Sequence, residues 1–426
     1  MEEDPEVPAQ ALPIRQKQPR QQLTKGMEHL RSYVIIPDTP PPTPPTILAK
    51  EESGDAHSDT YGVPATYQPI RNPSSAPKND NPEKRSNPFQ FGTRYLEEDS
   101  DIFSHNAWDH VEVDASYADF IEQQTLFQRS NQVSDFDKSR FYDAPEKWWD
   151  KFYSNNAANF FKDRKWLVQE FPVLGEVVKE GYGPMTVLEV GAGAGNTAFP
   201  LLGMNSNAEL RLHACDYSKK AIEVIRSQEA YTSQPGPIPV LQADVWDVAS
   251  PTTLPPGLEA GSVDIVLMIF IFSALSPAQW QQAVANVFTL LKPGGEVLFR
   301  DYGRGDLAQV RFKKGRYLEE NFYVRGDGTR VYFFEEGELR RIWEGEEQVG
   351  DSGQSGKVVG EEDEKRNGSV GFEIVDVAVD RRMLVNRQRK LKMYRCWMQG
   401  RFRKPLTGPK QADQEQKEKI CDDSGQ

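Results

Sequence analysis

The chain has 426 residues with 51 basic and 64 acidic side chains, a formal net charge of −13, and three cysteines. Three widely spaced cysteines form neither a disulfide framework nor a zinc site, which favours a reducing compartment. The longest apolar run, 265–272, is far shorter than the roughly 20 residues that span a bilayer, and the N-terminus lacks the apolar core of a signal peptide. Composition therefore excludes the secreted, membrane and fibrous classes. It predicts a cytoplasmic protein, with a mitochondrial or nuclear pool left open.

Proline dominates the first 88 residues, which hold 16 of the 30 prolines and few aromatic side chains. Such a segment cannot bury enough apolar surface to offset its ordering entropy, so we predict a disordered tail at 1–88. A polyproline ligand for a partner domain is the alternative interpretation. We expect an N-terminal helical region at 89–180 and an α/β domain at 181–405. An acidic insert interrupts this domain at about 344–368, and a second disordered tail follows at 406–426.

Strands and helices alternate along the α/β domain. Strands are expected at 186–190, 210–215, 239–243, 263–272, 296–300, 372–379 and 392–402, and helices at 197–202, 221–226 and 277–291. The fourth strand is apolar on both faces, which is typical of the centre of a parallel sheet. This order predicts a seven-stranded, doubly wound sheet with an N-terminal helical extension.

A glycine cluster with the spacing acid-x-G-x-G-x-G follows the first strand, from Glu189 to Gly195. Glycines let a ligand approach the backbone closely, while an acid before them would repel a pyrophosphate and suits the cationic S-adenosylmethionine. At the ends of the next two strands, Asp216 can accept both hydroxyl protons of a ribose and Asp244 can accept from an adenine amino group, with Val245 beside the ring. Together with the Leu-Lys-Pro-Gly-Gly turn before the fifth strand, these features predict a class I methyltransferase of Rossmann-like fold.

Two further patterns bear on the substrate. The fourth strand ends in Ile-Phe-Ile-Phe-Ser at 269–273, not in the Asn/Asp-Pro-Pro-aromatic turn that holds exocyclic amino groups of bases, so an exocyclic amine is disfavoured. The run 381–404 contains ten basic residues, no acidic ones and interleaved aromatic side chains, a composition compatible with RNA binding. A solvated edge strand explains the same run, so charge alone leaves RNA binding open.

Longer polar strings point to one family. They occupy 106–109, 147–153, 159–166, 170–172, 188–196, 299–304, 311–315, 321–334, 380–382 and 385–387. From about residue 89 to 405 the chain resembles the tRNA N3-methylcytidine methyltransferases. It departs from the family in having Ala192 where relatives often have Cys, and in its acidic insert.

The resemblance implies roles for individual residues near the cofactor. Trp149 and Tyr153 match an aromatic pair that closes over S-adenosyl-L-methionine, although their i,i+4 spacing alone would indicate core packing. The other positions implied to bind the cofactor are Gly191, Gly193, Asp216, Asp244, Val245 and Ile269. The string around Phe161, Lys162 and Arg164 resembles the family's lid over the target base.

The implied reaction is methylation of cytidine 32 in the anticodon loop of tRNA-Thr, tRNA-Ser or both. Asp301 and Asp163 are candidates to stabilise the cationic product, with a salt bridge to Arg300 or Arg304 as the structural alternative for Asp301. Phosphate contacts are expected from Arg304, Arg325, Arg330, Arg381, Arg382 and Arg387, and no metal is expected. A need for seryl-tRNA synthetase or another tRNA-selecting helper stays open. A methyltransferase acting on a protein or small molecule is the alternative function, and a non-enzymatic scaffold is a third.

Overall fold

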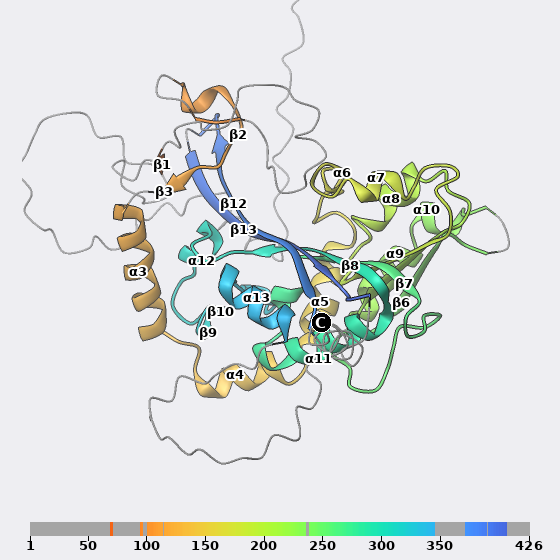
Figure 1. The fold of residues 1–426 in the computed structure, drawn as a ribbon. Helices are drawn as coiled ribbons and strands as arrows, with labels where there is room; N and C mark the ends of the chain where they lie inside the picture. The colour runs from red at the N-terminus through yellow and green to blue at the C-terminus, as the bar shows by residue number, and fades with distance from the viewer. Residues whose placement is uncertain are drawn as a thin grey trace, which may run out of the picture.

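The computed structural model describes residues 69–70, 94–96, 100–113, 115–235, 238–345, 371–389 and 391–406 (Figure 1). The tails predicted at 1–88 and 406–426 lie outside these residues, apart from 69–70 and Leu406. All but the first two residues of the acidic insert also lie outside them. The proposed division into domains therefore stays a prediction for these segments.

The centre of the fold is an eight-stranded sheet in the order β2-β12-β13-β8-β7-β4-β5-β6. The strands are β2 (Ala107–Asp109), β12 (Glu373–Asn386), β13 (Leu391–Arg403), β8 (Leu291–Tyr302), β7 (Val263–Ile269), β4 (Met185–Val190), β5 (Leu210–Asp216) and β6 (Leu241–Val245). The run from β8 to β6 is parallel, and β13, β12 and β2 add antiparallel neighbours. All seven predicted strands lie in this sheet, and the eighth, β2, comes from the N-terminal region. In Figure 1, β12 and β13 (blue) run from β2 to the middle of the molecule beside β8.

Strand ends differ from the prediction at several strands, and β7 ends at Ile269, three residues earlier than expected. β6 ends two residues later than expected, so Asp244 and Val245 are its last two residues. β8 begins at Leu291, so the turn expected at 292–295 lies within the strand, at a register shift opposite 263–265. β12 continues to Asn386 because its polar second half pairs with β13 through backbone hydrogen bonds, which do not require an apolar pattern.

Helices cover both faces of the sheet, as a doubly wound fold requires. They are α6 (Leu167–Glu170), α7 (Val173–Glu176), α8 (Ala198–Met204), α9 (Lys219–Arg226), α10 (Glu229–Thr232), α11 (Trp280–Leu290) and α13 (Glu336–Glu344). Alternate residues of β4 enter two cores: Leu188 packs with Trp280 of α11 and Trp343 of α13, while Val187 packs with residues of α6 to α9. The predicted helix at 277–291 is a 3-10 turn, η4 (Pro277–Gln279), followed by α11.

The N-terminal region is helical, as predicted. It contains α3 (Ala115–Ser130), α4 (Asp135–Tyr142) and α5 (Pro145–Asn156), with η2 (Ile102–Ser104) and a two-stranded pairing of β3 (Glu112–Val113) with β1 (Pro69–Ile70). Asp150 of α5 accepts hydrogen bonds from the Ser218 hydroxyl (2.7 Å) and the backbone N–H of Lys220 (3.1 Å). This contact with the first turn of α9 holds α5 beside the end of β5.

A small antiparallel sheet lies in the chain between β8 and β12 of the main sheet. It consists of β9 (Tyr317–Glu319), β10 (Phe322–Val324) and β11 (Arg330–Tyr332), in the order β11-β10-β9, and the short helix α12 (Leu307–Val310) precedes it. Three-residue strands are too short to show an alternation pattern, which explains why the sequence did not predict them. Their side chains form a separate aromatic cluster of Phe312, Tyr317, Tyr323, Val331 and Phe333.

Candidate active site

A cavity of about 440 Å³ opens at the carboxyl ends of the parallel strands, next to β4 and β7. Ligands of doubly wound folds bind at this edge, where the strand order reverses. One part of the lining comes from α5, from the turns after β4 and β7 and from the region around the end of β5. The other part comes from β8, α12, β13 and the turn between β10 and β11. The cavity therefore brings together segments that lie between residues 149 and 395 of the sequence.

The glycine loop forms one wall of the cavity. Gly191 and Gly193 have φ values of 68° and 59°, a region that L side chains rarely adopt. A Cβ atom on Gly193 would collide with the hydroxyl of Tyr153, and one on Gly191 would lie 2.7 Å from the Cβ of Ile271. Glycine is required at both positions because the backbone runs directly under these two side chains.

Asp216 joins the end of β5 to this loop. Its Oδ2 accepts the backbone N–H of Gly193 and its Oδ1 accepts the backbone N–H of Ser218, both at 2.9 Å. The side chain is buried, and burial raises the pKa of the Asp216 carboxyl to about 6. A carboxylate has about four acceptor positions, so two remain to accept the hydroxyl groups of a ribose. The remaining acceptor positions of Asp216 and the adjacent glycine loop thus fit S-adenosyl-L-methionine.

The aromatic pair of α5 lies over the glycine loop. Trp149 and Tyr153 are stacked with ring centroids 6.1 Å apart, and both line the cavity. Burial raises the pKa of the Tyr153 phenol, so this group is a neutral hydroxyl at physiological pH. The structure therefore places both residues where the family resemblance implies a cover over the cofactor.

Glu189 has a different environment from the one the glycine motif suggested. It is buried, its Oε2 accepts the backbone N–H of Ala198 at the start of α8 (3.1 Å), and its Oε1 lies 3.3 Å from the guanidinium of Arg164. Burial raises the pKa of the Glu189 carboxyl to about 7. Its charge therefore acts on α8 and on Arg164, which also bonds to Thr197 (3.0 Å), and not directly on a ligand.

Three residues expected at the adenosine lie outside the cavity lining. Asp244 pairs with Arg226 at 2.7 Å, Val245 is 40% exposed, and Ile269 is packed in the core. The lining residues at these strand ends are Trp246, Asp247, Phe270 and Ile271. The shift follows from the strand ends, because β6 stops two residues later than predicted and β7 stops at Ile269, before Phe270 turns with φ 60°.

The other wall is aromatic and basic. Of the predicted substrate residues, Phe161, Lys162, Arg164 and Arg325 line the cavity, and the Arg325 guanidinium lies 5.6 Å from the ring centroid of Tyr302. Sequence reasoning missed most of this wall, including Phe160, Trp166, Tyr302, Arg311, Phe312, Asp327, Phe333 and Arg395. Flat aromatic faces and guanidinium groups are what proteins use to hold unstacked nucleobases and RNA phosphates.

Asp301 and Asp163 are not among the described lining residues. Asp301 is fully buried, and its carboxylate accepts the backbone N–H groups of Ser273 (2.9 Å) and Tyr302 (2.8 Å), both of which line the cavity. Burial raises its pKa to about 6. Asp301 thus positions two wall residues, and it is not in the expected ion pair, because Arg300 pairs with Asp380. Asp163 lies 3.4 Å from the Asn196 amide.

Three predicted phosphate contacts are internal. Arg330 is 3% exposed and donates to the carbonyl of Ala274 (3.2 Å), while Arg304 pairs with Glu335 (2.8 Å) and Glu338 (3.1 Å). Arg382 pairs with Asp109, Glu170 and Asp380 at 2.9–3.3 Å. A count of charges along the sequence does not show these internal pairings, and a phosphate contact of the three arginines stays a prediction. Arg381 and Arg387 are exposed and remain candidate RNA contacts.

Two features are absent from the part of the chain that the structure describes: a membrane-spanning helix and a cluster of metal ligands. None of its helices is long and apolar enough to cross a membrane. Its residues also include no group of three or more His, Cys, Asp or Glu side chains that could hold a metal ion.

Comparisons with known proteins give one matching family model and several similar relatives. The family model described as "Methyltransferase domain" matches residues 188–297. The tRNA(Thr) (cytosine(32)-N(3))-methyltransferase of Saccharomyces cerevisiae is 47% identical over 322 residues, which cover 75% of this chain and 47% of that protein. The tRNA N(3)-methylcytidine methyltransferase trm140 of Schizosaccharomyces pombe is 43% identical over 74% of this chain and 92% of its own length. The tRNA N(3)-methylcytidine methyltransferase Mettl2 of Drosophila melanogaster is 39% identical over 76% of this chain and 91% of its own length. The chain thus spans about half of the budding yeast relative and about nine-tenths of the other two.

Proposed function

The chain belongs to the tRNA N3-methylcytidine methyltransferase family, and we propose that it methylates N3 of cytidine 32 in the anticodon loop of tRNA. The methyl donor is S-adenosyl-L-methionine. The observation that carries the proposal is a single cavity that joins Asp216 and the glycine loop to an aromatic, basic wall. The cations Lys162, Arg311 and Arg325 in that wall favour a polyanionic substrate such as RNA over a neutral small molecule.

The residues proposed to hold the cofactor lie on the β4, β5 and β6 side of the cavity. Asp216 accepts the ribose hydroxyls, the backbone of Gly191 to Gly193 lies under the ligand, and Trp149 and Tyr153 cover it. Trp246 and Asp247 take the place beside the adenine that the sequence had assigned to Val245 and Asp244. When bound, S-adenosyl-L-methionine supplies an electrophilic methyl group on a sulfonium.

The main task of the protein in this reaction is to position the base, because the base needs no deprotonation. Cytosine N3 carries a free lone pair in unpaired RNA at neutral pH, so no general base is needed. The protein must take the base out of the loop, hold N3 in line and exclude water. Flat side chains such as Phe161, Phe312 and Tyr302 can hold the base by stacking. The buried carboxylate of Asp301 fixes Tyr302 and Ser273 and adds negative potential behind the wall that faces the cationic product.

The choice of tRNA follows from the relatives. The budding yeast relative is named for tRNA(Thr) and cytosine 32, so tRNA-Thr is the proposed principal substrate of this chain. For methylation of tRNA-Ser, we propose that the chain needs a helper protein that selects the tRNA, such as seryl-tRNA synthetase. The reaction is proposed to take place in the cytoplasm, which fractionation of tagged protein would test.

Nucleoside mass spectrometry tests the function directly. Total tRNA and purified tRNA-Thr from cells with and without this gene are compared, and 3-methylcytidine should be lost from tRNA-Thr in the deletion. In parallel, the purified chain should methylate a tRNA-Thr transcript and leave a transcript with uridine at position 32 unmodified. Unchanged 3-methylcytidine in cells together with no activity in vitro would exclude the proposal.

A further inference from the structure

Guanidinium groups and indole rings alternate along one face of β13 and β8. The Cζ of Arg395 lies 4.8 Å from the ring centroid of Trp397, and the Cζ of Arg300 lies 5.0 Å from Trp397 and 5.2 Å from Trp166. Arg395 and Trp397 share this face because residues two apart on a strand point the same way. The two ends of the stack, Arg395 and Trp166, both line the cavity.

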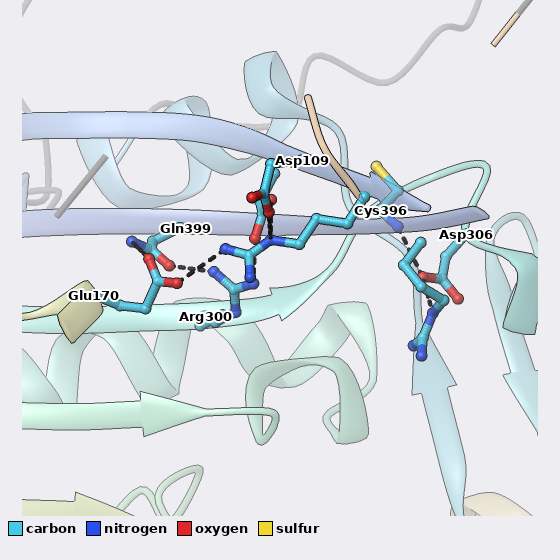
Figure 2. Close-up of polar contacts among 9 residues, drawn as sticks. Asp109, Glu170, Arg300, Asp306, Cys396 and Gln399 are labelled. Atoms are coloured by element: carbon cyan, nitrogen blue, oxygen red, sulfur yellow. Dashed lines mark hydrogen bonds and ion pairs between the residues drawn. The ribbon is translucent and has the colours of Figure 1, made fainter. Parts of the chain in front are cut away.

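Buried carboxylates hold the arginines of this stack. Arg300 pairs with Asp380, and Arg395 pairs with Asp306 at 2.8 Å between Nε and Oδ2, where both acids are fully buried. Figure 2 shows Gln399, which accepts a hydrogen bond from Arg300, next to Glu170, with Asp306 beside Cys396. The two arginines differ in access, because the side chain of Arg300 is 4% exposed and that of Arg395 is 25% exposed. Arg395 therefore combines a guanidinium held by a buried carboxylate with a place in the cavity wall.

Asp306 fixes more than the Arg395 side chain. Its Oδ2 also accepts the backbone N–H of Cys396, and its Oδ1 accepts that of Ala308 at the start of α12, both at 2.8 Å. One carboxylate therefore sets β13 relative to α12, whose residues Leu307 and Ala308 also line the cavity. Binding through Nε fixes the plane of the guanidinium, and a guanidinium with five donors can bind a second anion through its other edge.

We propose that Arg395 binds a phosphate next to the target nucleotide and that Asp306 is the residue that positions it. The inference rests on the proposed function, since it requires an RNA substrate. A cavity that accepts one unstacked base brings the phosphates on either side of that base to its walls, and arginine binds phosphate through two parallel hydrogen bonds. The RNA contact within the basic run thus lies at Arg395, where the strand faces the cavity, and not at Arg382 opposite it in register.

Arg401 provides a matched control. It lies on the same strand, pairs with the carboxylate of Glu296 at 2.8 Å and has a side chain 27% exposed, but it is not among the lining residues of the cavity. The experiment compares Arg395→Lys with Arg401→Lys in the full chain. Lysine keeps the charge opposite Asp306 or Glu296 and removes the planar fork, so both variants should fold.

Steady-state kinetics with a tRNA-Thr transcript and calorimetry with the cofactor give the readouts. Arg395→Lys should raise KM for tRNA about tenfold and leave cofactor affinity within about twofold, while Arg401→Lys should change neither. Asp306→Asn should raise KM for tRNA similarly, and the double variant should be no worse than either single one, because both changes disrupt one contact. Equal KM values for the two lysine variants would overturn the proposal.

Direct tRNA binding separates this inference from the proposed function. Arg395→Gln should lower the magnitude of the negative slope of log affinity against log salt concentration by about one, the effect of losing one phosphate contact, and Arg401→Gln should leave it unchanged. If the wild-type chain binds tRNA-Thr without methylating it, the proposed function fails and the salt slope still decides the role of Arg395. An unchanged slope in Arg395→Gln, or no tRNA binding by the wild type, would overturn the inference.

Discussion

The backbone N–H of Gly193 donates a hydrogen bond of 2.9 Å to the carboxylate of Asp216, which ties the loop after β4 to the end of β5. The residue proposed to bind the ribose therefore also shapes the glycine loop. The same carboxylate holds Ser218, the N-cap of α9, whose hydroxyl contacts Asp150 of the covering helix α5. The glycine loop, the proposed ribose acceptor Asp216 and the helix α5 are thus connected through hydrogen bonds.

Replacing Asp216 with alanine should abolish cofactor binding. The change removes both ribose acceptors and the partner of Gly193, and hydrogen bonds to a charged group are worth about 1.5–3 kcal/mol each, so affinity should fall at least about 100-fold. Isothermal titration with S-adenosylhomocysteine measures the loss, and circular dichroism verifies that the fold persists. Cofactor affinity equal to that of the wild type would show that the ribose is bound elsewhere.

Cofactor affinity should also depend on pH. Burial raises the pKa of Asp216 to about 6, and the ionised carboxylate is the form that accepts two hydroxyl protons. Affinity should therefore be full above about pH 7 and decline as the pH falls through 6, because protonation turns an acceptor into a donor. Titrations at a series of pH values, with the fold monitored at each, measure the midpoint. A midpoint near 4, the ordinary value for an aspartate, would contradict the assigned environment.

Replacing Gly193 with alanine should block the cofactor loop by a clash as well as by backbone strain. The added Cβ would meet the Tyr153 hydroxyl, whereas an alanine at Gly261, with a similar φ of 66°, meets no atom within 4 Å. Both variants should lose about 1 kcal/mol of stability, but only Gly193→Ala should lose cofactor affinity. Adding Tyr153→Phe to Gly193→Ala should recover part of that affinity, because it removes the colliding oxygen. No recovery would mean that the loop itself had moved.

Arg382 should prove to be a structural residue. Its guanidinium pairs with Asp109, Glu170 and Asp380 (Figure 2 shows the first two), so Arg382→Gln leaves three carboxylates without their counter-charge. Because the side chain is only partly buried, we expect a loss of about 2–4 kcal/mol in the free energy of unfolding, measured by urea denaturation. The exposed Arg387 supplies the comparison: Arg387→Gln should change stability by less than about 0.5 kcal/mol. A stable Arg382→Gln variant with weakened tRNA binding would reverse this assignment.

The fold and half of the site could be predicted because their signals are local. Each parallel strand is a short apolar run, and Gly191, Gly193 and Asp216 follow strands whose ends were placed to within a residue. Asp244 and Val245 do not line the cavity because their strand ends two residues later than predicted, and Trp246 and Asp247 line it instead. Strand ends depend on hydrogen bonding with a neighbour, which a single segment does not reveal.

By itself, the sequence determined the doubly wound sheet, the cofactor loop and the family, since these depend on residue type and spacing along the chain. Only the tertiary structure decided which arginines line the cavity. Arg382 and Glu170 are 212 residues apart in sequence and 2.9 Å apart in space, while Arg325 and Arg395 reach the cavity from separate segments. The charge of an arginine is the same everywhere in the sequence, but its role depends on whether folding places it in the cavity wall, as with Arg395, or away from that wall, as with Arg382.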